Sequence, residues 1–188
     1  MKNSSALLLI LLFSTCSIAQ GVFSNQTNYT LEKVVQDYPS QFKNIRGELI
    51  SSGAGAEAYK STIAIPGALT TTITQSAANQ KQVLSWESVL YKGSDFKAAS
   101  SRFEQLFNQI KNTIIKPRGE RAVIVNGMYA SPSAEMAVST IQFDMLPPTV
   151  LLQKMNIDLT MQNSGSQWTI SLRVYDKEPK EGQIVRGK

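Results

Sequence analysis

The sequence predicts an α+β fold, in which a mainly antiparallel sheet of about seven to eight strands has one long and one short helix packed on it. Three observations support this class. Strand-like segments follow one another instead of alternating with helices, one segment between them has helical periodicity, and the last two segments alternate apolar and polar residues. Consecutive strands with short turns pair antiparallel, and helices then cover one face of the sheet.

The short helix is expected between Thr30, which can cap its start, and Pro39, which ends it. Its apolar residues recur at positions i, i+3, i+4 and i+7: Leu31, Val34, Val35 and Tyr38. The preceding segment 20–28 is polar and without periodicity, so it is predicted to be a flexible leader.

The long helix is expected to start at Ser94 as N-cap, with Asp95 in its first turn, and to stop before Pro117. One apolar stripe runs along it: Phe96, Ala99, Phe103, Leu106, Phe107, Ile110 and Ile114. A stripe of this kind needs a sheet to cover it. The apolar side of the strand 83–91 is the expected cover.

Eight segments have the composition and alternation of strands: 45–51, 57–65, 69–75, 83–91, 121–130, 135–145, 154–162 and 167–176. In the last two segments, a shift of one residue in the pairing would turn the apolar side chains toward solvent. An odd-numbered residue of the first segment must therefore pair with an even-numbered residue of the second. The shortest sensible register sets Met161 opposite Trp168 across a four-residue loop, 163–166. The same register pairs outer-face residues: Asn156 with Arg173, and Asp158 with Ser171.

The first nineteen residues have the pattern of a signal peptide. Lys2 is followed by the apolar run ALLLILLF, and Ser17 and Ala19 occupy the −3 and −1 positions of a cleavage site. Eight apolar residues span about 12 Å as a helix, against roughly 30 Å of hydrocarbon, so no transmembrane span is expected. The protein is therefore predicted to be periplasmic or secreted; the alternative is a lipoprotein acylated at Cys16.

Cleavage after Ala19 leaves 188 − 19 = 169 residues without cysteine, so a hydrophobic core rather than disulfides must hold the fold. We divide the chain into a signal peptide (1–19), the flexible leader (20–28), a single α+β domain (29–176) and a disordered charged tail (177–188).

The composition excludes several chemistries. The sequence has no histidine, which rules out the Ser-His-Asp triad, the Cys-His dyad and the usual zinc and copper sites. No calcium-binding loop motif is present, and no cofactor is expected. The net charge of +5 is too mild for a nucleic-acid-binding surface.

Two short motifs resemble catalytic or cofactor patterns. Residues 53–58 match a relaxed dinucleotide fingerprint, but a strand pattern follows where the fingerprint needs a helix, so a hairpin turn is expected. Ser94 and Lys97 match the serine acylase pattern S-x-x-K, as do Ser40 and Lys43. Its partner motifs are absent, and an N-cap serine is the preferred interpretation of Ser94.

Carboxylates could still form an acid–base pair as in glycosidases. The candidates on strands are Glu87, Asp144 and Asp158, although their spacing brings no two together. Trp86 and Trp168 could stack on sugars, but both lie in register with aliphatic residues and are expected in the core.

A possible anionic-surface patch gathers at the end of the long helix: Lys111, Lys116, Arg118 and Arg121. It could meet lipid headgroups or acidic glycans, or it could only complement the helix dipole. Because the outer face of the last hairpin is polar, a partner is expected at this basic end or at the Thr-rich strand 69–75. The candidate partners are an anionic surface or another envelope protein.

The run from Tyr59 to Ala68, the strand 83–91 and the amphipathic helix after it resemble small uncharacterised exported proteins of Gram-negative bacteria. The resemblance spans about residues 42–115, implies an exported α+β domain and carries no activity. The expected function is thus a non-enzymatic exported binding or scaffolding domain, and the alternative is a carboxylate-dependent hydrolase acting outside the cytoplasm.

Overall fold

The computed structural model describes residues 19–53, 55–78 and 81–177. The predicted signal peptide as far as Ile18, with Cys16, and the predicted tail after Lys177 lie outside these ranges. Within them the chain forms two α-helices, one short 3-10 helix and nine strands. All nine strands belong to one antiparallel sheet with the order β1-β2-β3-β4-β9-β8-β7-β6-β5.

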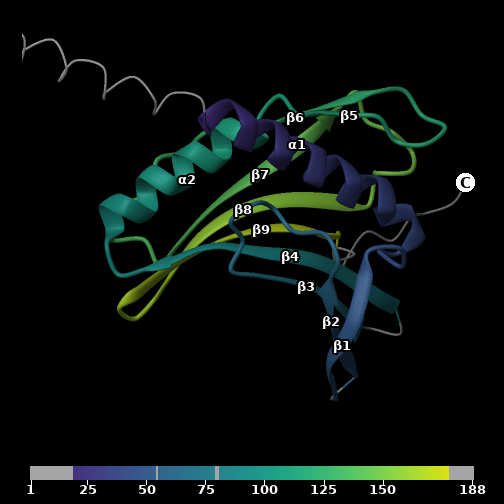
Figure 1. Ribbon diagram of the computed structural model, residues 1–188, viewed down its shortest axis with the longest axis horizontal. Coiled ribbons are helices and arrows are strands. Elements are labelled where there is room, and N and C mark those ends of the chain that lie inside the picture. The colour runs from purple at the N-terminus through teal and green to yellow at the C-terminus, as the bar shows by residue number, and fades with distance from the viewer. Residues whose placement is uncertain (1–18, 54, 79–80, 178–188) are drawn as a thin grey trace, which may run out of the picture.

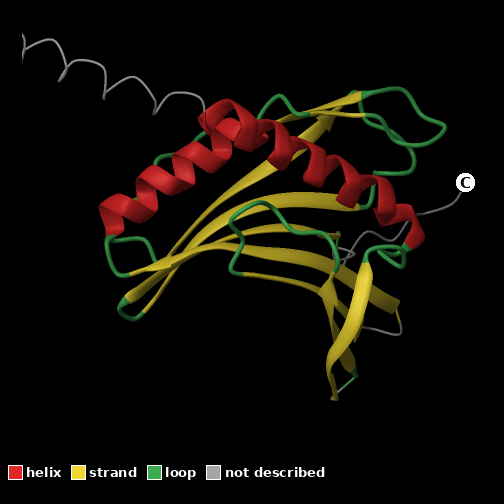
Figure 2. Cartoon of the chain, viewed as in Figure 1, coloured by secondary structure: helices red, strands yellow, loops and turns green. Residues whose placement is uncertain are grey.

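The helical elements are α1 (Ala19–Asp37), η1 (Tyr38–Ser40) and α2 (Phe96–Ile110). The strands are β1 (Arg46–Gly53), β2 (Ala56–Ser61), β3 (Thr70–Ala78), β4 (Lys81–Gly93), β5 (Ile114–Ile115), β6 (Val123–Asn126), β7 (Val138–Leu146), β8 (Met155–Ser164) and β9 (Gln167–Asp176). Both helices lie across the same face of the sheet, and the opposite face is left uncovered by the described elements (Figures 1 and 2).

The predicted α+β class is therefore confirmed, with slightly more strands than expected. The extra strand is β5, which contains Ile114 and Ile115. The sequence placed Ile114 on the stripe of the long helix, but that helix ends at Ile110. Asn112 then adopts a positive φ of 67° and turns the chain into β5.

The core lies between the helices and the sheet. The stripe of α2 contributes five buried residues: Ala99, Phe103, Leu106, Phe107 and Ile110. The expected cover is confirmed, because Leu84, Trp86 and Leu90 of β4 are buried in the same cluster. The indole Nε1 of Trp86 donates a hydrogen bond of 3.1 Å to Ser61 Oγ, so its polar atom is satisfied inside the core.

The N-terminal helix starts much earlier than predicted. It already includes Ala19, the first residue that the structure describes, so the expected leader 20–28 is helical and Thr30 lies inside the helix rather than at its cap. Polar contacts hold this part: the hydroxyl of Thr113 donates to Asn28 Oδ1 at 2.9 Å, and Thr27 is buried. Because polar side chains make these contacts, no apolar periodicity marks the segment.

Asp95, not Ser94, caps α2. One carboxylate oxygen of Asp95 accepts hydrogen bonds from the backbone N–H groups of Lys97 at 2.8 Å and Ala98 at 3.4 Å. Both residue types are common N-caps, and the sequence did not distinguish between two neighbouring candidates.

The last hairpin has the predicted pairing of strands and the predicted buried face, but its register is shifted by two residues. Met161 lies opposite Ile170, and Trp168 lies opposite Asn163. The loop contains only Gly165 and Ser166, and Gly165 has a φ of 73°, the type II′ pattern. On the outer face the observed pairs are Asn156 with Tyr175 and Asp158 with Arg173.

Candidate functional site

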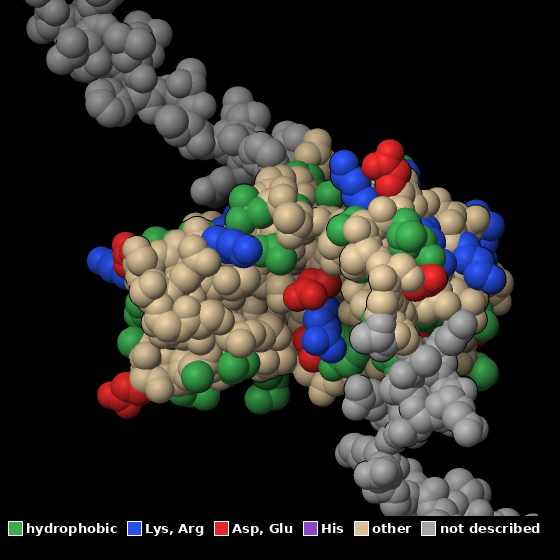
Figure 3. Space-filling view, turned by 90° about the horizontal axis from the view of Figure 1, so that it is seen from below, with side chains coloured by type: hydrophobic (Ala, Val, Ile, Leu, Met, Phe, Trp, Pro, Cys, Tyr) green, Lys and Arg blue, Asp and Glu red, His purple; other side chains and the backbone are tan. Residues whose placement is uncertain are grey.

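The uncovered face of the sheet has a row of polar and charged residues in direct register. Six strands contribute one residue each, in the order Lys60, Thr72, Glu87, Arg173, Asp158 and Gln142. We call this set the charged row. Acidic and basic side chains lie side by side in the middle of this face, surrounded mainly by uncharged polar surface (Figure 3).

Neighbouring side chains hold the centre of the charged row in place. The hydroxyl of Tyr175 donates a hydrogen bond of 2.7 Å to Asp158 Oδ2, and the Arg173 guanidinium lies 4.2 Å from the Tyr175 ring centroid. Partial burial and the hydrogen bond to Asp158 raise the pKa of Tyr175, so it stays a neutral donor at physiological pH. The other oxygen of Asp158 is buried without a hydrogen-bond partner.

The structure places two of the three candidate carboxylates in this row. Glu87 and Asp158 flank Arg173, and because neighbouring strands are about 4.8 Å apart, their backbones are separated by roughly 10 Å. Asp144 lies on β7 opposite Asn126, outside the charged row. The sequence could not show this grouping, because it depends on the β4–β9 pairing and on the hairpin register.

A second polar cluster lies on the helix side of β1–β3. The Arg46 guanidinium lies 4.5 Å from the Tyr59 ring centroid and donates to Gln75 Oε1 at 3.1 Å. The Tyr59 hydroxyl donates to Glu57 Oε2 at 2.6 Å, and this hydrogen bond is the main cause of the raised pKa of Tyr59. Sequence reasoning missed this cluster because its members come from three strands.

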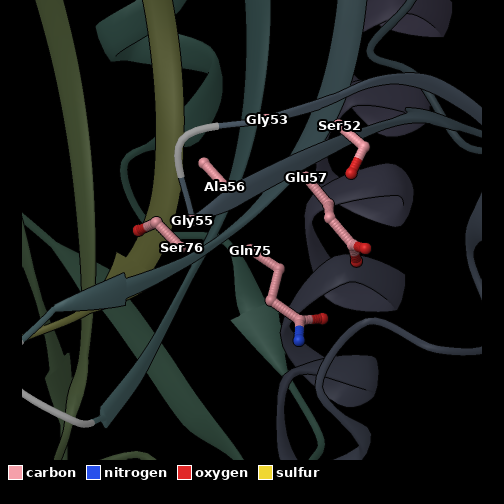
Figure 4. Close-up of a pocket in the computed structure, with 7 residues that line it drawn as sticks. All are labelled: Ser52, Gly53, Gly55, Ala56, Glu57, Gln75 and Ser76. Carbon is pink, nitrogen blue, oxygen red and sulfur yellow. The ribbon is translucent and has the colours of Figure 1, made fainter.

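An open hollow of about 350 Å³ adjoins this cluster at the tip of the β1–β2 hairpin (Figure 4). The side chains of Glu57 and Gln75 project to the same side there. Both already have hydrogen-bond partners, so the hollow offers few free polar groups. The glycines of the dinucleotide-like motif form this tip: β1 ends at Gly53 and β2 starts at Ala56, so no helix begins there to hold a pyrophosphate.

The predicted anionic-surface patch lies mostly in the β5–β6 connection. Lys116, Arg118 and Arg121 are exposed there. Lys111 is the C-cap of α2 and is half-buried, with its Nζ 5.6 Å from the Phe107 ring centroid. The acidic neighbours in this region are Glu120 in the same connection and Glu32 of α1, whose carboxylate accepts from the Lys116 backbone N–H at 3.3 Å.

The other candidates from the sequence analysis are either buried in the core, as the two tryptophans are, or exposed on the surface, as the two S-x-x-K pairs are. Trp86 is fully buried, and Trp168 is 5% exposed with its ring centroid 5.2 Å from that of Phe96, so neither offers a face to a sugar. Ser94 and Lys97 are both exposed beside the Asp95 cap, and Ser40 and Lys43 are exposed around the 3-10 helix.

Among the described residues, no group of three or more Asp, Glu, Cys or His side chains is arranged to hold a metal ion. Within the same part of the chain, neither helix has the length and apolarity needed to cross a membrane. Comparisons of the chain with family models, with curated proteins and with solved structures found no match.

Proposed function

We propose that the protein is an exported, non-enzymatic binding domain that presents the uncovered face of its sheet to a polar partner such as another envelope protein. The observation that carries this proposal is the charged row, in which Glu87, Arg173 and Asp158 alternate in sign across three neighbouring strands. This surface includes the outer face of the last hairpin, where the sequence predicted no partner. It also reaches the Thr-rich strand, where a partner was expected, through Thr72 of β3.

The arrangement is typical of a recognition surface because its side chains are already ordered. Tyr175 holds Asp158 by a hydrogen bond and stacks under Arg173, while Gln142 donates to Asn156 Oδ1 at 3.0 Å. Side chains fixed in advance lose little conformational entropy on binding. A partner with an acidic group opposite Arg173 and basic groups on either side would be electrostatically complementary.

The alternative function, a carboxylate-dependent hydrolase, would use Glu87 and Asp158. Inverting glycosidases separate their two carboxyl groups by roughly 6.5–9.5 Å and leave room for a water molecule and the sugar between them. Here Arg173 stands between the two carboxylates in the row. This order favours binding over catalysis, because the two carboxylates stand on strands that are not neighbours, with the strand that bears Arg173 between them.

The proposal can be tested by site-specific photo-crosslinking in cells that export the protein. A photoreactive residue at Ser171, beside Arg173 on the uncovered face, should form a discrete adduct with one partner. The same residue at Ser101, which is exposed on α2, is the matched control and should form none. The charge reversal Arg173→Glu should abolish the Ser171 adduct while the protein remains folded. Its melting temperature should fall only modestly, since the new carboxylate would face Glu87 and Asp158 on the neighbouring strands.

Equal adducts from both positions, or an adduct that survives Arg173→Glu, would contradict the proposal. The hydrolase alternative has a separate measurement. Release of reducing sugars from envelope glycans by the purified protein, abolished by both Glu87→Gln and Asp158→Asn, would establish it in place of binding.

A further inference from the structure

Three exposed hydrophobic residues lie in direct register at the β5 end of the sheet. Ile114 pairs with Ile124, and Ile124 pairs with Leu146, across β5, β6 and β7. Their side chains are 64%, 46% and 47% exposed. The alternate residues Ile115 and Val123 are fully buried, so this apolar row is on the side of the strands away from the core.

The β7–β8 connection extends the apolar surface. Immediately after Leu146 the chain turns through two prolines, and then Val150 is 78% and Leu151 is 44% exposed. Five of the twelve exposed large hydrophobic residues of the described chain thus come from β5, β6, the last residue of β7 and the connection after it. Exposed apolar residues concentrated in this way mark an interaction surface rather than chance exposure.

Cations border this apolar surface. Lys116 follows Ile114 by two residues, and Arg118 and Arg121 complete the connection to β6. Arg118 shares a surface hollow of about 410 Å³ with Leu151 and with Lys33 of α1, which joins the basic connection to the apolar one.

We propose that this basic and apolar end, defined by Ile114, Ile124, Leu146, Val150 and Leu151 with Lys116, Arg118 and Arg121, docks the protein on an anionic lipid surface. The lysine and arginine side chains meet acidic headgroups, while the hydrophobic side chains enter the boundary between headgroups and acyl chains. This function goes beyond the proposed partner binding, because it uses residues outside the charged row.

The shape of the surface favours lipid over an acidic protein partner. The most exposed residues of this set, Val150 and Ile114, lie on a connection and an edge strand, where side chains project. A bound helix would need an apolar groove, and a bound strand would need a longer free edge than the two residues of β5. Projecting apolar side chains beside cations are the arrangement that binds membrane interfaces. Of the acidic side chains near this end, Asp37 is buried and accepts hydrogen bonds from Asn44. The other three, Glu32, Glu120 and Asp144, are fewer than the four cations Lys33, Lys116, Arg118 and Arg121.

Co-sedimentation with vesicles tests the proposal. The protein should consist of residues 20–188, verified by intact mass, because the run ALLLILLF would itself enter lipid; these residues contain every buried side chain of the described core, from Thr27 to Val174. It should bind vesicles of mixed phosphatidylglycerol and phosphatidylcholine much more tightly than pure phosphatidylcholine. Each cation near an anionic leaflet contributes roughly a fivefold factor, so Lys116→Glu, Arg118→Glu and Arg121→Glu together should weaken binding about a hundredfold or more.

Matched controls separate the site from net charge and from general hydrophobicity. Lys43→Glu, Lys92→Glu and Lys97→Glu together make the same change in charge at exposed positions outside both proposed surfaces, and binding should be reduced much less. Ile114→Ser with Ile124→Ser should abolish vesicle binding. Leu49→Ser with Ile50→Ser, on the exposed strand β1, should leave it unchanged.

Insertion of the apolar side chains into the lipid is measured separately by fluorescence. The emission of an environment-sensitive dye on Val150→Cys should shift to shorter wavelength when anionic vesicles are added, and that of a dye on Ser101→Cys should not.

The proposal is overturned if anionic vesicles are not bound, or if the two isoleucine substitutions have no effect on vesicle binding. It is equally overturned if soluble dextran sulfate competes fully with vesicles, which would show a general polyanion site. Because all these variants leave Arg173 intact, the lipid result and the photo-crosslinking result are independent.

Discussion

At the scale of single residues, individual carboxylates make hydrogen bonds on which local structure depends. Asp95 caps α2 and Asp176 joins the helical layer to the sheet, since its two oxygens accept from the Tyr38 hydroxyl at 2.6 Å and from the Leu84 backbone N–H at 3.0 Å. The sequence indicates that a cap is needed near residue 94 but not which residue provides it. The Tyr38–Asp176 contact joins residues 138 positions apart, so no local pattern reveals it.

We predict that Asp95→Ala lowers the free energy of unfolding by about 1 kcal/mol, because two backbone N–H groups at the start of α2 lose their acceptor. Ser94→Ala is the control and should change it by less than about 0.5 kcal/mol, as surface substitutions do. Denaturant titration of both variants measures the difference. A larger effect at Ser94 would mean that the serine is the cap after all.

Alkaline stability should depend on Tyr38. Burial and the hydrogen bond to Asp176 raise the pKa of the Tyr38 hydroxyl above its ordinary value of 10.0, so the folded chain holds this proton more tightly than the unfolded chain. The resulting stabilisation is complete below pH 10 and is lost as the pH rises further.

Tyr38→Phe should therefore cost roughly 1.5–3 kcal/mol at neutral pH, the usual contribution of a hydrogen bond to a charged group. Above pH 10 its stability should fall less steeply than that of the unmodified protein. Chemical denaturation at a series of alkaline pH values measures both effects, and Tyr29→Phe, at an exposed position, is the control. Parallel curves for Tyr38→Phe and the unmodified protein would contradict the assignment.

At the scale of elements, hydrophobic pattern predicted faces well and boundaries poorly. The alternation in β8 and β9 correctly placed Met161 and Trp168 on the buried face, because a shift by one residue would have exposed both. A shift by two residues keeps every face unchanged, so the pattern cannot exclude it. The two-residue turn at Gly165 and Ser166 decides the register, and the alternation contains no information on turn length.

Gly165→Ala should lower the free energy of unfolding by about 1–2 kcal/mol, because a residue with a β-carbon is strained at a φ of 73°. No neighbouring atom lies within 4 Å of the added carbon, so the cost would come from the backbone alone. Gly53→Ala is the control, with open space and no positive φ, and should be nearly neutral. Urea titration distinguishes the two; equal effects would argue against the tight turn.

The helix α2 should be a main element of the core. Phe103 is fully buried on its apolar side, so Phe103→Ala should cost about 3–5 kcal/mol. Ser101→Ala, on the exposed side of the same helix, should change stability by only a few tenths of a kcal/mol. An unchanged denaturation midpoint for Phe103→Ala would show that α2 does not pack on the sheet as described.

At the scale of the whole molecule, strand order is what the sequence cannot provide. The β4–β9 pairing joins two halves of the chain and brings Glu87 beside Arg173, while β5 and β6 form the far edge and carry the exposed isoleucines. Of the predicted surface residues, the basic set from Lys111 to Arg121 could be recognised because it is local in sequence. The charged row and the apolar row could not, since each needs three or more strands in register.

The last prediction concerns the processing of the whole chain, on the proposal that the protein is exported. The described part of α1 runs from Ala19 to Asp37, so cleavage after Ala19 would leave all but its first residue in the mature chain, including Asn28 and its contact with Thr113. We therefore expect intact-mass analysis of natively exported protein to give residues 20–188. A fragment that begins with an acylated Cys16 would contradict this expectation. In that case the lipid chains would anchor the protein, and the basic and apolar end would set its orientation on the membrane rather than its affinity.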